Sequence, residues 1–146
     1  MKINKYLFTL VTIGLLTINL NAKSQNSNID EIKKDTLVFV VVEESPEFQG
    51  GDQARIEYLI KNINYPKKAR KAGIQGTVYI TFIIEKDGKV SNVRILRGIG
   101  GGCDEESLRV VKNMPKWKPG RQRGKNVRVQ YNMPLKFTLE DDNNKQ

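Results

Sequence analysis

The sequence contains no histidine and only one cysteine, Cys103, among its 146 residues. Without histidine, the chain lacks the commonest general base, the commonest metal ligand and the usual pH switch. A single cysteine excludes an internal disulfide and a zinc site built from several cysteines. Catalysis could therefore rely only on carboxylates, lysines and one thiol. We predict that the protein is not an enzyme and needs no cofactor.

The chain is strongly basic, and its N-terminal segment narrows the kinds of partner that this charge indicates. It has 25 lysines and arginines against 16 acidic residues, a formal charge of +9, which is common in proteins that bind nucleic acid or anionic surfaces. However, Lys2 and Lys5 precede an uncharged, mostly apolar stretch over 6–20, and a polar segment begins at Asn21. This order is typical of a secretory signal peptide.

The N-terminal segment predicts export. We expect cleavage after Ala22, with an uncleaved anchor as the alternative, because the apolar stretch is short for a membrane span. Either outcome places the domain outside the cytoplasm, where cell-wall polymers, anionic membrane surfaces and acidic proteins fit its charge and nucleic acid is not an expected partner. The predicted parts are a signal peptide or anchor over 1–22, a polar linker over 23–35, a folded domain over 36–140 and a polar tail over 141–146.

Hydrophobic periodicity in the first half of the domain predicts a strand and two helices. The β-branched stretch 36–42 predicts a strand. Asp52 is suited to cap a helix, and Pro66 is suited to begin a second, shorter one. The first helix carries apolar residues at the spacing of one helical face, namely Ile56, Leu59, Ile60 and Ile63.

The second half of the domain predicts a hairpin, a helix and a long final strand. Alternating residues over 77–85 and 90–96 flank Asp87-Gly88, a strong hairpin turn signal. The apolar face changes parity between Val90 and Val93, which predicts a bulge or a late start of the strand. Cys103 or Asp104 is expected to cap the next helix, and period-2 alternation over 127–139 predicts a half-buried strand. The fold class is α+β, a small antiparallel sheet with helices on one face.

Three features of the Gly98–Asp104 region could carry chemistry, and each has a plainer explanation. The glycines over 98–102 lie where phosphate loops occur, but no Gly-Lys-Ser/Thr follows. Acidic residues over 104–106 would also repel a phosphate. Cys103 lacks a histidine partner, and its acidic neighbours oppose a thiolate. We therefore predict an ordinary turn, a small packed residue and a helix-capping cluster, with no metal site.

The densest basic stretch is the loop over 116–128, which includes Trp117. It could bind a cell-wall polymer or an acidic partner, or it could be a solvated loop. We expect Trp117 to be a core residue under the loop rather than a platform for a sugar.

The final strand is the strongest candidate for function. Pro134 lacks the N–H that a β-ladder needs, and proline within sheets is largely confined to edges and bulges. Arg128 and Lys136 on its polar face discourage aggregation. This strand is therefore predicted to have one open side that can accept an extended peptide as an added strand, although a loop could instead protect that edge.

The ordered series of motifs in the domain resembles the C-terminal domain of the TonB family, in the form common in Bacteroidetes. The motifs are Pro46-Glu47-Phe48, Gly50-Gly51, Tyr65-Pro66 with Ala69, Gly76-Thr77-Val78, Phe82, Asp87-Gly88, Asp104-Glu105, Leu108-Arg109-Val110-Val111, Met114-Pro115-Lys116-Trp117-Lys118-Pro119-Gly120 and Met133-Pro134-Leu135-Lys136-Phe137. Each piece alone is weak, but the series is specific and spans Pro46 to about Leu139.

The resemblance implies a three-stranded antiparallel sheet backed by helices, with a short N-terminal strand as an addition. It also implies a periplasmic module that grips an extended segment, the TonB box, of an outer-membrane receptor and is linked to nutrient uptake. The contact residues carried over are Val127, Arg128, Val129, Gln130, Tyr131, Asn132 and Met133, together with Tyr65 and Pro66. An open edge also allows a strand-swapped homodimer.

Two departures separate this chain from a full transducer of that family. The family's inner-membrane helix usually carries a histidine, and its spacer is rich in proline, whereas here all five prolines lie between residues 46 and 134. The alternative hypothesis is therefore a free periplasmic binding or scaffold protein that transmits no force.

Overall fold

The computed structural model describes residues 36–139. The predicted signal peptide or anchor, the polar linker and the C-terminal tail lie outside the described residues. None of the helices within 36–139 has the length and apolar character needed to cross a membrane.

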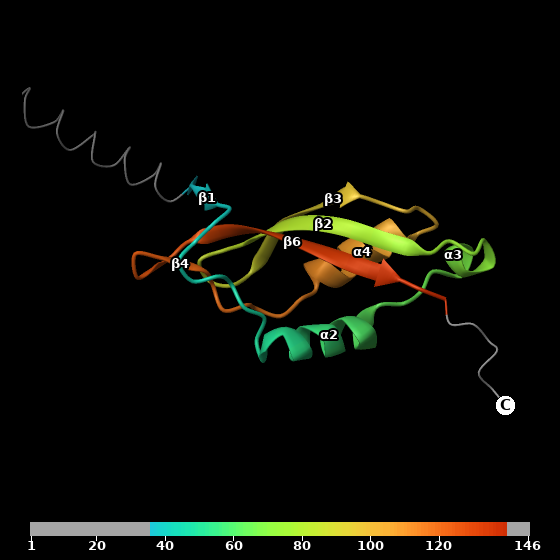
Figure 1. Ribbon diagram of the computed structural model, residues 1–146, viewed down its shortest axis with the longest axis horizontal. Helices are drawn as coiled ribbons and strands as arrows, with labels where there is room; N and C mark the ends of the chain where they lie inside the picture. The colour runs from blue at the N-terminus through green and yellow to red at the C-terminus, as the bar shows by residue number, and fades with distance from the viewer. Residues whose placement is uncertain (1–35, 140–146) are drawn as a thin grey trace, which may run out of the picture. The chain divides into compact units, whose positions relative to one another are not determined.

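The fold is built on a mixed four-stranded sheet in the order β1-β6-β2-β3 (Figure 1). Its strands are β1 (Val38–Phe39), β2 (Gly76–Ile84), β3 (Val90–Arg97) and β6 (Arg128–Phe137). Strand β2 pairs antiparallel with both β3 and β6, as predicted, whereas β1 pairs parallel with β6. The expectation of a wholly antiparallel sheet is therefore wrong at one strand, although the α+β class is confirmed.

Strand β1 is much shorter than the predicted strand over 36–42. Only Val38 and Phe39 pair with β6. The backbone then leaves the sheet, because the backbone groups of Glu44 exchange hydrogen bonds with those of Arg121 at 3.1 and 2.9 Å. Local β-propensity is thus overridden by a contact with a distant loop.

The β2–β3 hairpin confirms the two local predictions made for it. A register shift lies between Thr81 and Ile83, and Asn92 on the facing strand has φ 50, so the predicted bulge is present. At the turn, Gly88 has φ 83, and a Cβ there would lie 2.0 Å from the carbonyl oxygen of Trp117. Glycine is therefore required both by conformation and by space.

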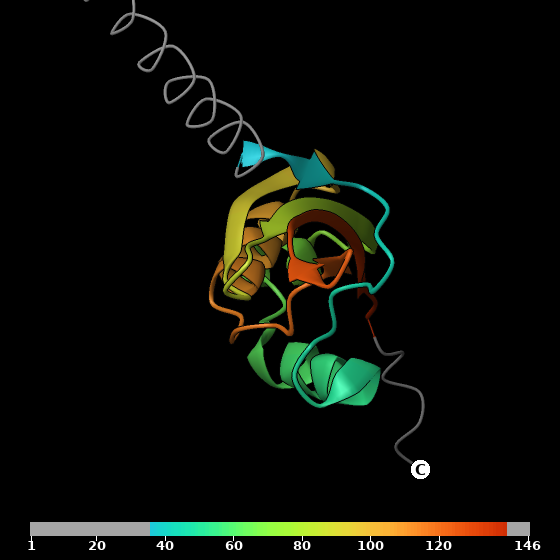
Figure 2. The ribbon, with the colours of Figure 1, turned by 90° about the vertical axis from the view of Figure 1, so that its left-hand side faces the viewer.

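The helices α2 (Gly51–Asn62), α3 (Lys67–Lys71) and α4 (Cys103–Lys112) match the predicted ones to within a residue or two. Figure 2 shows α2 and α4 on the same side of the sheet. The N-caps of α2 and α4 are the glycines Gly50 and Gly102, with φ 87 and 93, and not aspartate or cysteine. The chain enters both helices in a left-handed conformation that favours glycine.

The core lies between the sheet and the helices. It consists of Phe48, Ala69, Val78, Ile80, Phe82, Ile84, Cys103, Val111, Met114, Trp117, Met133, Leu135 and Phe137. Trp117 is 3% exposed, and its ring packs edge-on against Phe48 and Phe82 at 5.4 and 5.8 Å. The expectation that this tryptophan belongs to the core is therefore confirmed.

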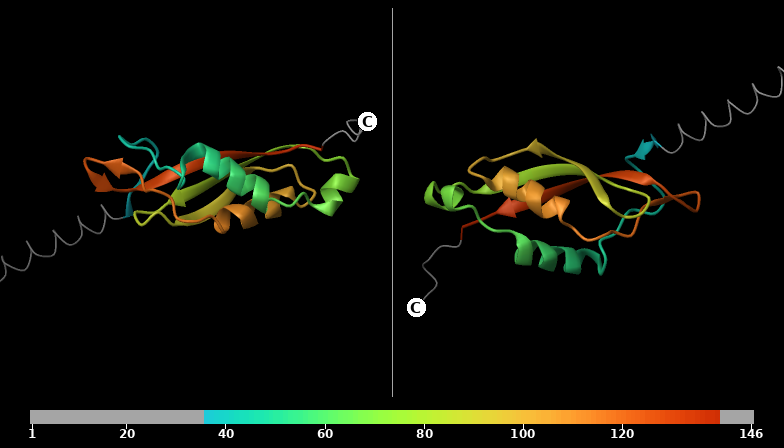
Figure 3. Two further views of the ribbon diagram at one scale, coloured as in Figure 1. Left: turned by 90° about the horizontal axis from the view of Figure 1, so that it is seen from below. Right: turned by 180° about the vertical axis from the view of Figure 1, so that it is seen from behind.

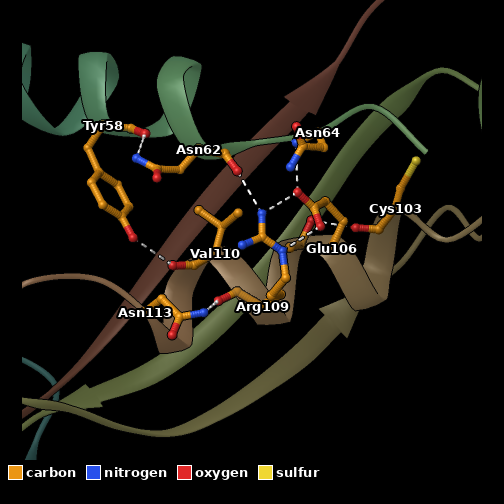
Figure 4. A network of polar contacts seen from close by, with 9 residues as sticks. Tyr58, Asn62, Asn64, Cys103, Glu106, Arg109, Val110 and Asn113 are labelled. Atoms are coloured by element: carbon orange, nitrogen blue, oxygen red, sulfur yellow. Dashed lines mark hydrogen bonds and ion pairs between the residues drawn. The ribbon is translucent and has the colours of Figure 1, made fainter. Parts of the chain in front are cut away.

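Helix α2 is held to α4 by a polar network (Figure 4). Arg109 of α4 donates to the carbonyl oxygen of Asn62 at 2.7 Å and pairs with Glu106 at 2.6 Å. Glu106 in turn accepts a 2.7 Å hydrogen bond from the backbone N–H of Asn64. The hydroxyl of Tyr58 donates to a backbone carbonyl of α4 at 3.2 Å. These contacts fix the rotation of α2 about its own axis.

That rotation leaves half of the predicted apolar face of α2 uncovered. Leu59 and Ile63 pack against the core, but Ile56 is 46% and Ile60 75% exposed. No residue of α2 is fully buried. The spacing of the apolar residues predicted the helix correctly, but it did not predict which of these residues face the core.

Candidate partner-binding edge

The outer edge of β6 is open over most of its length. On one side, β6 pairs with β2 from Val129 to Phe137 without interruption. On the other side, β1 covers only Arg128 and Val129. Within residues 36–139, no strand pairs with the outer edge from Gln130 to Phe137 (Figure 1).

Pro134 determines which backbone groups point out of this edge. It lies opposite Tyr79 in the unbroken β2–β6 register, yet it has no N–H to donate. Its backbone must therefore face away from β2, since in an antiparallel pair successive residues direct their N–H and C=O groups to alternate sides. By the same parity, Gln130, Asn132 and Lys136 also face outward. An added strand can therefore pair with the N–H groups of Asn132 and Lys136. It can also pair with the outward carbonyl groups of the same even-numbered residues.

The side chains of β6 alternate between a buried face and an exposed face of the sheet. The odd-numbered residues Met133, Leu135 and Phe137 are each 2% exposed and form part of the core. Asn132, Pro134 and Lys136 are exposed. Two of the residues carried over as partner contacts, Val129 and Met133, have buried side chains that cannot contact a partner.

The beginning of β6 is already engaged within the domain. Arg128 donates to both carboxylate oxygens of Glu85, at 2.7 and 3.0 Å, and the hydroxyl of Ser91 donates to the same carboxylate at 2.5 Å. The hydrogen bond from Arg128 is the main reason why the pKa of Glu85 is lowered, although partial burial opposes this. Val127 donates its N–H to Gly120 at 2.9 Å.

Tyr131 connects the edge to α2. Its hydroxyl oxygen accepts a hydrogen bond from Arg55 of α2 at 3.0 Å. Its ring lies 5.1 Å from that of Trp117 and 5.6 Å from that of Phe82. Tyr131 therefore positions α2 beside β6 as well as lying in the predicted site.

Tyr65 and Pro66 lie at the opposite end of β6 from Val127–Val129. The ring of Tyr65 packs edge-on against Phe137 at 5.7 Å, and its hydroxyl donates to the carbonyl of Ile74 at 2.5 Å. Burial is the main cause of the raised pKa of Tyr65. A strand of this length spans about 30 Å, so the predicted residues form one long line and not a compact cluster.

Part of the basic loop is paired with carboxylates from a distant segment. It folds into a small hairpin of β4 (Arg121–Gln122) and β5 (Lys125–Asn126). Lys118 lies 3.5 Å from Glu47, and Arg121 lies 3.5 Å from Glu44. Less positive charge is thus available to bind a cell-wall polymer than the sequence of the loop implies. Binding of the loop to the cell wall stays a prediction.

The glycine loop is occupied by the protein's own carboxylate. Ile99 and Gly100 donate their backbone N–H groups to Asp104 at 2.9 and 3.2 Å. A Cβ at Gly98 would lie 2.1 Å from a carboxylate oxygen of Asp104. Asp104 therefore takes the position that an anionic ligand would need, which agrees with the predicted turn.

Cys103 has no exposed thiol. Its side chain is fully buried, and this burial raises the pKa of the thiol, with a further rise from the charges of Asp104 and Glu105. These conditions oppose a reactive thiolate.

No curated protein matches this chain. The solved C-terminal domain of Helicobacter pylori TonB, residues 194–285, has a TM-score of 0.47 at 22% identity, covering 62% of this chain and 95% of that chain. The Pseudomonas aeruginosa TonB C-terminal domain has a TM-score of 0.43 at 25% identity, covering 53% and 79%.

The family comparison is the decisive one. The family described as Gram-negative bacterial TonB protein C-terminal matches residues 61–139, which is more than half of the chain. The match begins at the last turn of α2 and includes every later element as far as the end of β6. This chain belongs to the TonB C-terminal domain family.

Proposed function

We propose that this protein is a TonB-type interaction module in the periplasm, linked to energy-dependent nutrient transport across the outer membrane. It binds a TonB-dependent receptor by accepting an extended, TonB-box-like segment as a new strand on β6. The observation that carries the proposal is the open edge from Gln130 to Phe137. Family membership supports receptor interaction and a place in the cell envelope.

The geometry supports strand addition in preference to a pocket-based mode of binding. The outward backbone groups of β6 recur at every second residue, as an incoming β-strand requires. Each backbone hydrogen bond contributes about 0.5–1.5 kcal/mol net. Several such bonds in a row, without a deep pocket, would give an affinity that depends on main-chain continuity and tolerates side-chain variation.

The test uses synthetic peptides that copy the N-terminal extended segments of outer-membrane receptors from the source organism. Asn132→Pro removes an outward N–H, so we expect binding about tenfold weaker in fluorescence anisotropy, with little change in the urea midpoint. Lys136→Pro, which removes the other available outward N–H, should act in the same direction. The matched control is Asn132→Ala, which keeps the N–H and should bind like the wild type.

Binding that survives both proline substitutions would show that the edge of β6 is not the site. Met133→Pro provides an internal check on the parity argument. Its N–H faces β2, so this substitution should destabilise the fold itself.

The alternative is a periplasmic scaffold that uses the same edge without transmitting force. It is favoured by the absence of proline from residues 1–45, since a stiff proline-rich segment would act as a spacer. Membrane fractionation distinguishes the two functions, because a fully soluble product cannot transmit force from the inner membrane. Sedimentation velocity would show whether two copies instead pair through the open edge.

A further inference from the structure

Helix α3 carries cations at four of its five positions, and no carboxylate pairs with them. These exposed side chains, which we call the α3 patch, are Lys67, Lys68, Arg70 and Lys71. Within residues 36–139, none of the four forms an ion pair. The basic loop differs, because some of its cations lie beside carboxylates. The α3 patch is therefore a surface of uncompensated positive charge.

The helix directs all four cations away from the core. Successive residues of a helix turn by about 100°. The middle residue, Ala69, is fully buried, so the other four positions fall on the opposite side of α3. An open hollow between the lysine side chains is lined by Lys67, Lys68, Lys71 and Ala72. The charges thus form one continuous surface.

The rest of the domain holds this short helix in place. Ala69 packs against the glycine loop, since a Cβ at Gly101 would lie 3.0 Å from that of Ala69. The guanidinium of Arg70 lies 5.6 Å from the centre of the Tyr65 ring, which packs in turn on Phe137. The α3 patch is therefore a preformed surface, and no ordering of the helix is needed before it binds.

Helix α3 lies at one end of the domain. In Figures 1 and 3, β1 lies toward the opposite end, and β6 runs along the length between them. A broad surface that contacts α3 end-on therefore leaves most of the open edge of β6 accessible.

We propose that the α3 patch docks the domain on a membrane surface rich in anionic phospholipid. Three of its four cations are lysines, whose ammonium groups are compact point charges that need no fixed geometry of the acceptor. Specific protein interfaces are depleted of lysine and rely on aromatic and arginine anchors. The one apolar residue of α3, Ala69, is buried. A layer of headgroup phosphates fits such a patch better than an acidic protein does.

The strength of this docking follows from the number of charges. Each lysine or arginine close to an anionic bilayer strengthens binding about fivefold, so four give roughly several hundredfold. The attraction falls off within a Debye length, so salt weakens it. Docking is therefore reversible and electrostatic, and it is independent of the proposed strand addition.

The test measures cosedimentation of the protein with lipid vesicles. It uses residues 23–146, the form expected after signal cleavage, which keeps every described helix and strand and lacks the apolar N-terminal segment. One set of vesicles is phosphatidylcholine alone, and the other contains about 30% phosphatidylglycerol. The variant combines Lys67→Gln with Lys71→Gln. The matched control combines Lys112→Gln with Lys125→Gln, which removes two exposed lysines from α4 and the basic loop.

We expect the wild type to bind only the vesicles that contain phosphatidylglycerol, and to be released when NaCl is raised from about 0.05 to 0.5 M. The variant in α3 should bind more than about tenfold more weakly, and the control pair less than about threefold. Unchanged urea midpoints show that both pairs fold. Equal losses in the two pairs would mean that only net charge matters and would overturn the proposal. A wild type that does not bind these vesicles would also overturn it.

A final measurement separates a membrane from an acidic protein as the partner. Polyglutamate is added in place of vesicles at the same concentration of negative charge. The proposal requires the wild type to bind the vesicles more tightly than polyglutamate. Tighter binding to polyglutamate, lost in the α3 variant, would assign the patch to an acidic protein instead.

Discussion

Gly88 and Gly124 both occupy hairpin turns with positive φ, yet their surroundings differ. A Cβ at Gly88 would lie 2.0 Å from the carbonyl oxygen of Trp117, whereas nothing lies within 4 Å of one at Gly124. Trp117 also donates its N–H to the carbonyl of Gly88 at 2.8 Å. The β2–β3 turn is thus packed against the segment that carries the central tryptophan.

We predict that Gly88→Ala destabilises the domain by about 3 kcal/mol or more, because it adds a steric clash with backbone to the conformational cost. Gly124→Ala, the control, should cost only about 1–2 kcal/mol. Urea denaturation of both variants measures the difference. Equal losses would mean that the close approach at Trp117 is readily relieved.

At the scale of secondary-structure elements, β1 decides how much of the β6 edge is available. Strand β1 covers the first two residues of that edge, and no other strand within residues 36–139 pairs with it. The element that covers the edge is weakly held: Val38 is 37% exposed, and the neighbouring Val40 and Val41 are 71% and 84% exposed.

We predict that β1 can be removed without unfolding the domain. A chain that begins at Glu43 should lose about 1 kcal/mol of stability relative to one that begins at Ser24, because only two residue pairs are lost. Amide hydrogen exchange at Arg128 and Gln130 should become faster, while exchange in β2 should not change. Loss of cooperative unfolding would instead make β1 an essential part of the sheet.

The elements that could be predicted from sequence are those whose signals are local. The β2–β3 hairpin, its bulge, α4 and β6 all follow from alternation, turn residues and helical spacing between near neighbours. The same reasoning predicted one apolar face for α2, but the helix turns Ile56 and Ile60 outward. Its rotation is set by Arg109 and Glu106, which lie more than forty residues along the chain.

At the scale of the whole molecule, the formal net charge is +9. Several of the basic side chains nevertheless lie beside carboxylates, which the sequence alone does not indicate. The acidic residues over 43–47 neutralise part of the basic loop. Glu85, Asp87 and Glu106 each accept hydrogen bonds that lower their pKa values. The pH dependence of stability follows from these carboxylates and from the absence of histidine.

We predict a nearly constant urea midpoint between about pH 5.5 and 7 and a steep fall below about pH 4. A carboxyl whose pKa is lower in the folded state stabilises the fold fully above its unfolded pKa, and this contribution is lost as the pH falls through the folded pKa. Glu85→Gln should lower the midpoint at pH 7 and make the acid transition shallower. A stability change centred near pH 6.5 would contradict the assignment.

The sequence by itself determined the α+β class, most of the elements, the core position of Trp117 and the choice of β6 as the candidate edge. Each of these depends on patterns between residues close together in the chain. Only the tertiary structure decided that β1 joins β6 in parallel. It also decided that Lys118 and Arg121 of the basic loop pair with carboxylates 71 and 77 residues away, and that α2 leaves Ile56 and Ile60 exposed. Such contacts join segments whose separate patterns carry no record of each other, so they appear only when the whole core is assembled.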